Sequence, residues 1–300
     1  GINFFDTADQ YNGGRAEAIL GRLMKGERDE LIIATKCFNA TAPDINARGT
    51  SRRHMSRAVE ASLKRLDTDR IDVFFLHHLD RRTPIEEQMR GLEDLVRAGK
   101  ILYPAVSNYA AWQTQQALGV QALNGWARLQ VIEPMYNLVK RQAEVEILPM
   151  AAANRLAVIP YSPLGAGLLS GKYNRSGPSA EATRASSEAD EPAENAVGRL
   201  QSNNMYQLRY SDDWVMQTAA DFVRLCEARG LNPVSTAVAW VGAHPAVTAP
   251  IIGARNLTQL ADSLASVDVP MTSTLRDEIG ALSPIPAPAT DRLEEQKKGR

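Results

Sequence analysis

The feature that most constrains the fold of this chain is the alternation of strand-like runs with amphipathic helical stretches. The apolar runs are short and rich in branched and aromatic residues, as buried strands are. They end near Thr7, Cys37, His78, Ser107, Tyr136, Ser162 and Gly253. Helical stretches are expected over residues 15–25, 51–66, 84–98, 111–125, 143–154, 213–229, 234–241 and 257–264. Strands that alternate with helices predict βαβ crossovers, and therefore an α/β protein with a parallel sheet.

A (β/α)8 barrel of the TIM type is the α/β fold that this order favours. Because such a barrel has eight strands, we expect seven of them here, in a single barrel domain over 1–300 that is incomplete at its N-terminal end. A doubly wound open sheet is the alternative, but no G-x-G-x-x-G follows any strand-like run. Two segments depart from the alternation: 174–213 is expected to be a long loop, and 284–300 an extended tail.

Composition limits the class of protein and its partners. The 300 residues are 44% hydrophobic and 23% charged, which is ordinary for a globular protein. The formal net charge of −1 argues against nucleic acid or an anionic membrane as a general partner. No apolar run approaches the roughly 20 residues of a membrane span. Cys37 and Cys226 lie too far apart in the sequence to suggest a metal site or a disulfide framework, so a reducing cytoplasm is the expected location.

Polar residues stand where three of the strand-like runs end. Asp6 closes the first run, Lys36 the second and His77-His78 the third, and Tyr11 follows Asp6 in the next loop. In a barrel the carboxyl ends of all strands meet at one rim, where active sites lie. We therefore expect these side chains to converge. The structural alternatives are a loop-capping aspartate, a packed tyrosine, a solvated lysine and a packed histidine pair.

These residue types suit the reduction of a carbonyl group. Tyrosine has a reference pKa of about 10, so it is a protonated donor at neutral pH. An ammonium such as that of Lys36 eases release of the proton, and Asp6 would compensate the buried ammonium. A histidine can donate a hydrogen bond to the carbonyl oxygen and orient it. None of these side chains carries a hydride, so a cofactor must supply one.

With these residues in place, the chain resembles the aldo-keto reductase superfamily over almost its whole length. The resemblance rests on GINFFDTADQY, IIATK, IDVFFLHHLD, GKILYPAVSN, PMYNLVKRQAEVEILPMA, VIPYSPLGAGLLSGKY and APIIGARNLTQLADSL, in this order. It implies a (β/α)8 barrel that binds NADPH or NADP+ without a Rossmann unit. It also implies a catalytic tetrad of Asp6, Tyr11, Lys36 and His77. His77 is preferred to its neighbour because the motif histidine stands five residues after Asp72.

The resemblance also implies a set of cofactor-binding residues. Ser107 and Asn108 match the pair on the nicotinamide amide, and Tyr161 matches the aromatic ring that stacks on the nicotinamide. Residues that match the loop along the pyrophosphate are Ser162, Leu164, Gly165 and Lys172. Residues that match the segment around the adenosine 2′-phosphate are Gly253, Arg255, Gln259 and Asp262. Arg255 also precedes an expected helix, whose N-terminus favours anions; the alternative for it is a solvated surface cation.

The chain departs from the family pattern in four places. Glu133 stands where a glutamine partner of the nicotinamide amide is usual, and a carboxylate keeps the acceptor but loses the amide donor. Ala105 replaces a glycine, and Ser263 replaces an asparagine that often meets the adenine. The opening hairpin, first strand and first helix of the pattern have no counterpart. An impaired relative, a fragment and a start-site error all fit these departures.

The sequence favours NADPH-dependent reduction of an aldehyde or ketone to an alcohol. The substrate would be a small-molecule carbonyl compound and Tyr11 the proton donor. The alternative is a non-catalytic NADP(H)-binding subunit resembling potassium-channel β subunits, which retain the tetrad. A barrel hydrolase is a third interpretation, but paired carboxylates around a cleft are not evident. The sequence leaves the physiological carbonyl and the oligomeric state open, because substrate choice lies in loops such as 174–213.

Overall fold

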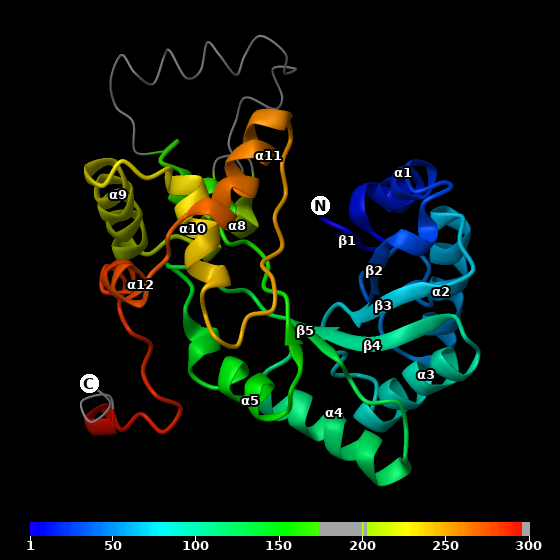
Figure 1. Ribbon diagram of the computed structural model, residues 1–300. Helices are drawn as coiled ribbons and strands as arrows, with labels where there is room; N and C mark the ends of the chain where they lie inside the picture. The colour runs from blue at the N-terminus through cyan, green and yellow to red at the C-terminus, as the bar shows by residue number, and fades with distance from the viewer. Residues whose placement is uncertain (174–199, 201–202, 296–300) are drawn as a thin grey trace. The chain divides into compact units, whose positions relative to one another are not determined.

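The computed structural model describes residues 1–173, 200 and 203–295 (Figure 1). The chain divides into two compact units. Unit 1 consists of Gly1–Pro134 and Ile147–Ile159, and unit 2 of Met135–Glu146 and Pro160–Arg300.

Unit 1 is built on a sheet of six parallel strands whose order along the sheet is their order in the sequence. The strands are β1 (Phe4–Asp6), β2 (Ile32–Cys37), β3 (Ile71–Leu76), β4 (Ile101–Ser107), β5 (Val131–Glu133) and β6 (Ala157–Val158). Since every strand runs in the same direction, all of their carboxyl ends lie at one edge of the sheet. The sequence prediction of an α/β fold with a parallel sheet is confirmed.

The expected count of seven barrel strands is wrong for the part of the chain that the structure describes. The apolar run that ends at Gly253 is not a strand there. One ladder-like bond remains, because Ile251 N donates to Pro160 O over 2.9 Å. Pro250 stands in the middle of the run and has no N–H to donate, which breaks the continuous ladder a strand needs.

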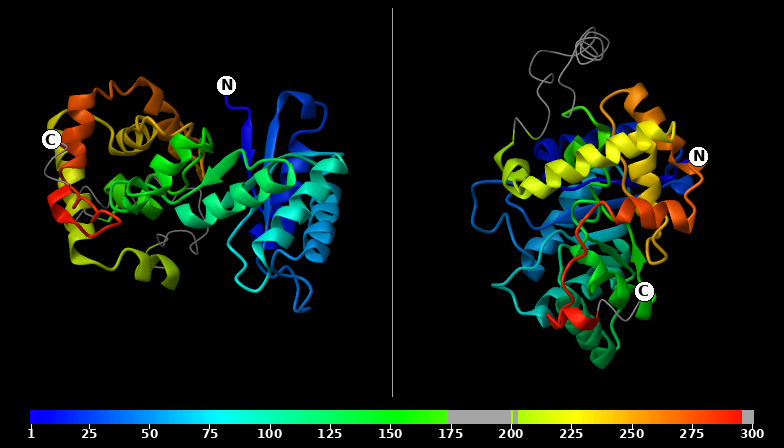
Figure 2. Two further views of the ribbon diagram at one scale, coloured as in Figure 1. Left: turned by 90° about the horizontal axis from the view of Figure 1, so that it is seen from below. Right: turned by 90° about the vertical axis from the view of Figure 1, so that its left-hand side faces the viewer.

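Helices cover the outer face of this sheet. They are α1 (Arg15–Leu23), α2 (Arg52–Leu66), α3 (Ile85–Arg97), α4 (Ala111–Asn124) and α5 (Ile147–Ala153). Each packs against the next in sequence, and α2 and α3 also contact β2 and β4 (Figures 1 and 2). Ser51 caps α2 by accepting a hydrogen bond from His54 N. Every residue of β3 is buried, so this strand is covered on both faces.

The core of unit 1 lies between the sheet and these helices. Apolar side chains from α2 and α3, such as Met55 and Leu92, meet strand residues such as Ile33 and Phe74, and all four are completely buried. Burying a side chain of this size contributes about 1.5–3 kcal/mol. The helices α1 and α2 approach so closely that a Cβ atom on Gly21 would lie 2.6 Å from a backbone oxygen of α2.

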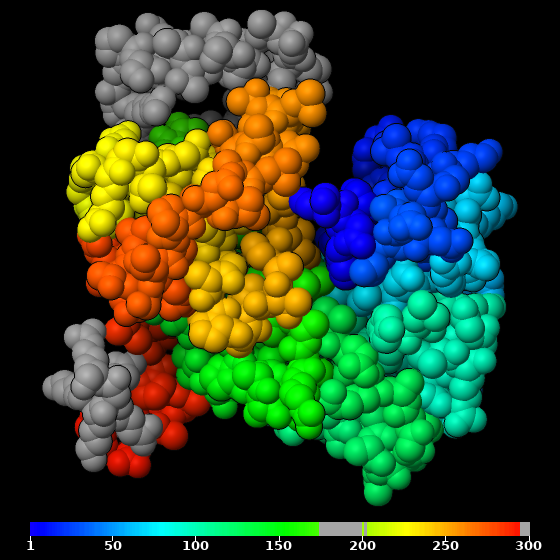
Figure 3. Space-filling model, viewed as in Figure 1, coloured from blue at the N-terminus to red at the C-terminus, as the bar shows by residue number. Residues whose placement is uncertain are grey.

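Unit 2 is mainly helical. Its helices are α8 (Asn204–Arg209), α9 (Asp213–Ala228), α10 (Pro233–Gly242), α11 (Leu257–Leu264) and α12 (Ser273–Gly280). Trp240 on α10 is buried, and its indole N–H donates to Arg276 O of α12 over 3.0 Å. Tyr136 packs on Trp240 and donates its hydroxyl to Glu144 over 2.6 Å. Figure 3 shows the outer surface of α11 and α12. No helix in the described ranges has the length and apolarity needed to cross a membrane.

Two expectations concern the segments that depart from the alternation. Most of the expected loop 174–213 lies outside the described residues, and its described end contains α8. The expected tail 284–300 is described as far as residue 295, and in that part it forms one short 3₁₀ turn, Leu293–Glu295.

Candidate active site

Lys36 is the centre of a buried charged cluster in unit 1. Its ammonium nitrogen donates to both carboxylate oxygens of Asp6 at 2.5 Å and to the carbonyl oxygen of Thr7 at 3.0 Å. Glu133 Oε2 lies 3.2 Å from the same nitrogen. The Lys36 side chain is completely buried, and those of Asp6 and Glu133 are 9% and 4% exposed. A buried ammonium needs such compensation, because an unpaired charge in the interior is very costly.

The local structure of β2 aims Lys36 at this cluster. Neighbouring side chains on a strand point to opposite faces of the sheet. Thr35 bonds to Glu17 of α1, on the face that the helices cover. Lys36 therefore points to the opposite, inner face, where its Nζ also lies 5.4 Å from the ring centre of Phe75.

The contact between Lys36 and Glu133 shows that the sheet is strongly curved. Lys36 belongs to β2 and Glu133 to β5, which are three steps apart in the strand order. In a flat sheet, strands three steps apart lie about 14 Å from each other, and their side chains project in parallel. A separation of 3.2 Å between Nζ and Oε2 requires the sheet to curl around its inner face, as in part of a barrel.

Tyr11 and His77 complete the group of four predicted catalytic residues. The Tyr11 and His77 rings stand edge to face with their centres 5.9 Å apart, and Lys36 Nζ lies 5.6 Å from the Tyr11 ring centre. Tyr11 is 38% exposed, whereas His77 is buried and its ring stacks on that of His78. The structure thus brings all four side chains together, and of the four Tyr11 is the most exposed.

Burial and charge set the ionisation of this site. Burial lowers the pKa of His77 to about 3, with the Lys36 and His78 charges adding to the effect, so the imidazole is neutral at neutral pH. Burial alone would lower the pKa of Lys36, but Asp6 and then Glu133 outweigh it and raise that pKa above its ordinary value. Burial raises the pKa of Glu133 to about 8, with Lys36 opposing the shift and Asp6 adding to it.

Ser107 and Asn108 lie beside the cluster at the end of β4. Ser107 Oγ donates to the Glu133 carbonyl over 2.9 Å. Asn108 Nδ2 donates to the His77 carbonyl and to Ser107 Oγ, both at 3.0 Å. Asn108 has φ 58°, in the left-handed region where asparagine is one of the few tolerated residues. These two predicted nicotinamide partners are thereby tied to the ends of β3 and β5.

The other predicted cofactor residues belong to unit 2, and a backbone bond joins two of their segments. Ile251 N donates to Pro160 O, so the segment before Gly253 lies beside Tyr161. Arg255 is exposed immediately before α11, and its backbone N–H donates to Gln259 Oε1 over 3.2 Å. The further predicted residues of this unit are Ser162, Leu164, Gly165, Lys172 and Asp262. The Ser162–Gly167 loop uses left-handed backbone at Ser162, Gly165, Ala166 and Gly167.

Comparison with known proteins decides the family. The aldo/keto reductase family matches residues 1–283. The chain belongs to the aldo/keto reductase family.

Several aldo/keto reductase relatives are similar over most of their length. The uncharacterized oxidoreductase YrpG of Bacillus subtilis is 33% identical, over 97% of this chain and 85% of that protein. A probable voltage-gated potassium channel subunit beta of Arabidopsis thaliana is 31% identical, over 90% of this chain and 79% of that protein. L-glyceraldehyde 3-phosphate reductase of Escherichia coli K12 is 31% identical, over 89% of this chain and 75% of that protein.

Unit 1 also contains a buried acid, Asp9, that the sequence analysis did not single out. Asp9 is 2% exposed, and neither of its carboxylate oxygens makes a hydrogen bond to the described residues. Burial raises its pKa to about 7; Glu17 adds to the shift and Arg65 opposes it. Its backbone N–H donates to Lys36 O over 3.1 Å, which helps to hold the loop that carries Tyr11. An acid three residues after Asp6 was the available signal.

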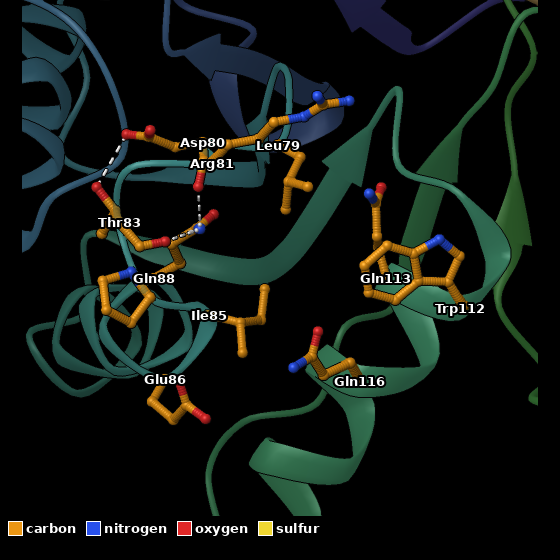
Figure 4. A pocket seen from close by; sticks show the side chains of 11 residues that line it. Leu79, Asp80, Arg81, Thr83, Ile85, Glu86, Gln88, Trp112, Gln113 and Gln116 are labelled. Atoms are coloured by element: carbon orange, nitrogen blue, oxygen red, sulfur yellow. Dashed lines mark hydrogen bonds between the residues drawn. The ribbon is translucent and has the colours of Figure 1, made fainter.

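A cavity of about 450 Å³ adjoins the loop that follows the histidine pair (Figure 4). Residues from this loop and from the first turns of α3 and α4 line it: Leu79, Asp80, Arg81, Thr83, Pro84, Ile85, Glu86, Gln88, Trp112, Gln113 and Gln116. Gln88 fixes the loop by donating to the carbonyls of Asp80 and Thr83. None of the predicted catalytic or cofactor residues of the aldo/keto reductase site lines this cavity.

Proposed function

We propose that this aldo/keto reductase uses NADPH to reduce an aldehyde or a ketone to the alcohol. The observation that carries the proposal is the buried Lys36–Asp6 ion pair, with the rings of Tyr11 and His77 packed beside it. This arrangement combines a proton donor, a cation that stabilises its conjugate base, and a neutral hydrogen-bonding ring. Those are the groups that protonation of a carbonyl oxygen requires.

Each side chain has a distinct role in this proposal. The Tyr11 hydroxyl holds the proton that passes to the carbonyl oxygen, and its partial exposure lets the substrate reach it. The Lys36 ammonium stabilises the resulting phenolate. Asp6 keeps that ammonium charged and oriented through two hydrogen bonds. Neutral His77 orients the carbonyl oxygen by hydrogen bonding.

The residues fit an NADP cofactor. Arg255 is exposed just before the N-terminus of α11, and a guanidinium at a helix N-terminus suits the 2′-phosphate that distinguishes NADPH from NADH. We propose that Arg255, Gln259 and Asp262 hold this end of the cofactor. The pyrophosphate would lie along the Ser162–Lys172 segment of unit 2, and in unit 1 the Ser107–Asn108 pair would bind the nicotinamide amide. When bound, NADPH supplies the hydride.

A non-catalytic NADP(H)-binding subunit is the second candidate. The observation that favours it is the 31% identity with the potassium channel subunit beta of Arabidopsis thaliana. For either candidate we propose the cytoplasm as the location, because both cysteines are buried and unpaired, as a reducing compartment allows.

The two candidates differ in turnover. The purified chain is mixed with NADPH and an aromatic aldehyde, and the loss of NADPH absorbance is followed. Aldehyde-dependent loss that disappears in Tyr11→Phe supports the reductase. Quenching of tryptophan fluorescence by NADPH, without turnover of any of a panel of aldehydes and ketones, supports the subunit. Absence of both responses would overturn both.

A further inference from the structure

Glu133 is a second carboxylate at the ammonium that Asp6 already neutralises. Its Oε2 lies 3.2 Å from Lys36 Nζ, and its side chain is 4% exposed. If Asp6, Glu133 and Lys36 were all ionised, this buried group would carry a net charge of −1. A single proton shared by the two carboxyl groups removes that charge, as in other sites where two buried carboxyl groups lie close together.

The hydrogen bonds of Lys36 decide which carboxyl group is the weaker partner. An ammonium has three N–H groups. Lys36 directs them at the two oxygens of Asp6 and at the Thr7 carbonyl. Glu133 Oε2 is buried, and its 3.2 Å contact with Lys36 Nζ is longer and less well aligned than the two 2.5 Å bonds to Asp6, so Glu133 is the weaker partner of the ammonium. An ionised carboxylate in this position is poorly compensated, whereas a protonated one has no charge to compensate.

We propose that Glu133 is a positioning residue that sets the charge of the Lys36 cluster: it holds a proton while carbonyl reduction proceeds, and its ionisation slows that reduction. This inference rests on the proposed function, since it concerns the proton donor of that reaction. Glu133 acts on this reaction through Lys36. With Glu133 neutral, the ammonium is shared only between Asp6 and the Tyr11 phenolate as that phenolate forms.

Ionisation of Glu133 opposes the same step. The charged groups that act on it are Asp6 from β1 and Lys36 from β2, and Tyr11 and His77 lie near the same ammonium. A new negative charge here competes with the phenolate for the one ammonium, so proton release from Tyr11 becomes harder. Because the pKa of Glu133 is raised to about 8, the protonated form prevails at neutral pH and is lost above it.

The kinetic test uses Glu133→Gln, which keeps the shape and cannot ionise. The turnover number with saturating NADPH and aldehyde is measured from neutral to alkaline pH in the wild type, in Glu133→Gln and in Glu146→Gln, an exposed control. In the wild type and in the control, we expect the turnover number at alkaline pH to be about tenfold lower than at neutral pH. In Glu133→Gln we expect it to fall by less than about twofold. An alkaline loss of the same size in Glu133→Gln would overturn the proposal.

The second test needs no cofactor and no turnover. Infrared difference spectra record the carbonyl stretch of protonated carboxyl groups as the free protein is titrated. We expect one band that is present at neutral pH, disappears above it, and is absent in Glu133→Gln. Asp9 contributes a band of its own, so the assignment rests on the difference between wild type and variant. A spectrum unchanged by Glu133→Gln would overturn the proposal even if the protein reduced no carbonyl compound.

A third variant guards against misfolding of Glu133→Gln. In Asp6→Asn, Glu133 is the carboxylate that remains beside Lys36 among the described residues, so Glu133 should then be ionised at neutral pH. We expect the Glu133 band to disappear at neutral pH in Asp6→Asn and to reappear on acidification. Persistence of that band at neutral pH in Asp6→Asn would mean that the two carboxyl groups do not compete for Lys36.

Discussion

Asp6 and Lys36 form a bidentate ion pair inside unit 1, in which both carboxylate oxygens lie 2.5 Å from the ammonium nitrogen. A buried charge that loses its only partner typically costs about 3–5 kcal/mol of stability. Lys36 has a second carboxylate in reach, because Glu133 Oε2 lies 3.2 Å away. Glu133 can therefore compensate the Lys36 charge when Asp6 is lost, which no group can do in an isolated buried pair. Measurements of the free energy of unfolding can detect this compensation.

Removing the Asp6 carboxylate should lower the stability of the protein less than breaking an isolated buried ion pair does. Asp6→Asn should lower the free energy of unfolding by about 1–2 kcal/mol, because Glu133 ionises and replaces the lost charge. The double variant Asp6→Asn/Glu133→Gln should lose about 3–5 kcal/mol, more than the two single losses together. Urea denaturation at neutral pH measures all three. Strict additivity would show that Glu133 does not compensate for Asp6.

Removing the Tyr11 hydroxyl should abolish most turnover and leave cofactor binding intact. Tyr11→Phe keeps the ring that packs on His77 but lacks the proton, so carbonyl reduction should fall by about 10²-fold or more. NADPH affinity, measured by tryptophan quenching, should stay within about twofold, since one hydroxyl remote from the phosphates contributes little to it. Tyr103→Phe, at a half-exposed tyrosine of β4, is the matched control. Full turnover in Tyr11→Phe would contradict its assignment as proton donor.

Arg255 should decide between the two nicotinamide cofactors. Arg255→Ala should weaken NADPH by about 10–100-fold and NADH by much less, because only NADPH carries the 2′-phosphate. Arg224→Ala, at an exposed arginine of α9, should change neither affinity. Fluorescence titration of both cofactors with both variants checks this. Equal weakening of NADPH and NADH by Arg255→Ala would mean that Arg255 does not bind that phosphate.

Two helix glycines should respond to alanine in opposite directions. A Cβ on Gly21 of α1 would lie 2.6 Å from Leu66 O, a backbone atom that cannot move aside, so Gly21→Ala should cost about 1–3 kcal/mol. A Cβ on Gly119 of α4 would meet nothing within 4 Å, so Gly119→Ala should stabilise by about 0.5–1 kcal/mol. Thermal unfolding compares the two variants. A stable Gly21→Ala variant would show that α1 and α2 can separate at little cost.

Asp9 should make the protein less stable as the pH rises. Its pKa is raised from 3.8 to about 7 in the folded state, so between these values the folded chain holds a proton that the unfolded chain has released. The free energy of unfolding therefore falls as pH rises through this window. Asp9→Asn cannot ionise; it should match the wild type near pH 4 and exceed it by about 3–4 kcal/mol above pH 7.

The Asp9 prediction is checked by urea denaturation across the same pH range. The exposed Glu146→Gln serves as the control and should follow the wild-type curve. A constant difference between Asp9→Asn and the wild type at all pH values would show that Asp9 does not titrate in this window.

Helix prediction succeeded where the pattern is local. The stretch expected over 51–66 is α2 (Arg52–Leu66) with Ser51 as its cap, and the stretch expected over 257–264 is α11. Two helices were missed: α8 lies in the stretch that was expected to be a loop, 174–213, and α12 lies between the stretch expected over 257–264 and the tail expected from 284. The missing strand before Gly253 had an apolar composition, but Pro250 removed the donor that strand pairing needs.

The sequence by itself determined the α/β order, the residues at the strand ends and the family, because each of these is written in local patterns and motifs. The meeting of Asp6, Lys36 and His77 followed from the rule that parallel strands end at one rim. Only the tertiary structure decided that Glu133 reaches Lys36 and that Asp9 is buried without a hydrogen bond. The contact between Glu133 and Lys36 depends on the curvature of the sheet, which brings β5 opposite β2. The burial of Asp9 depends on the packing of α1 against α2 beside the loop after β1. Both are products of packing between distant segments, which no local pattern encodes.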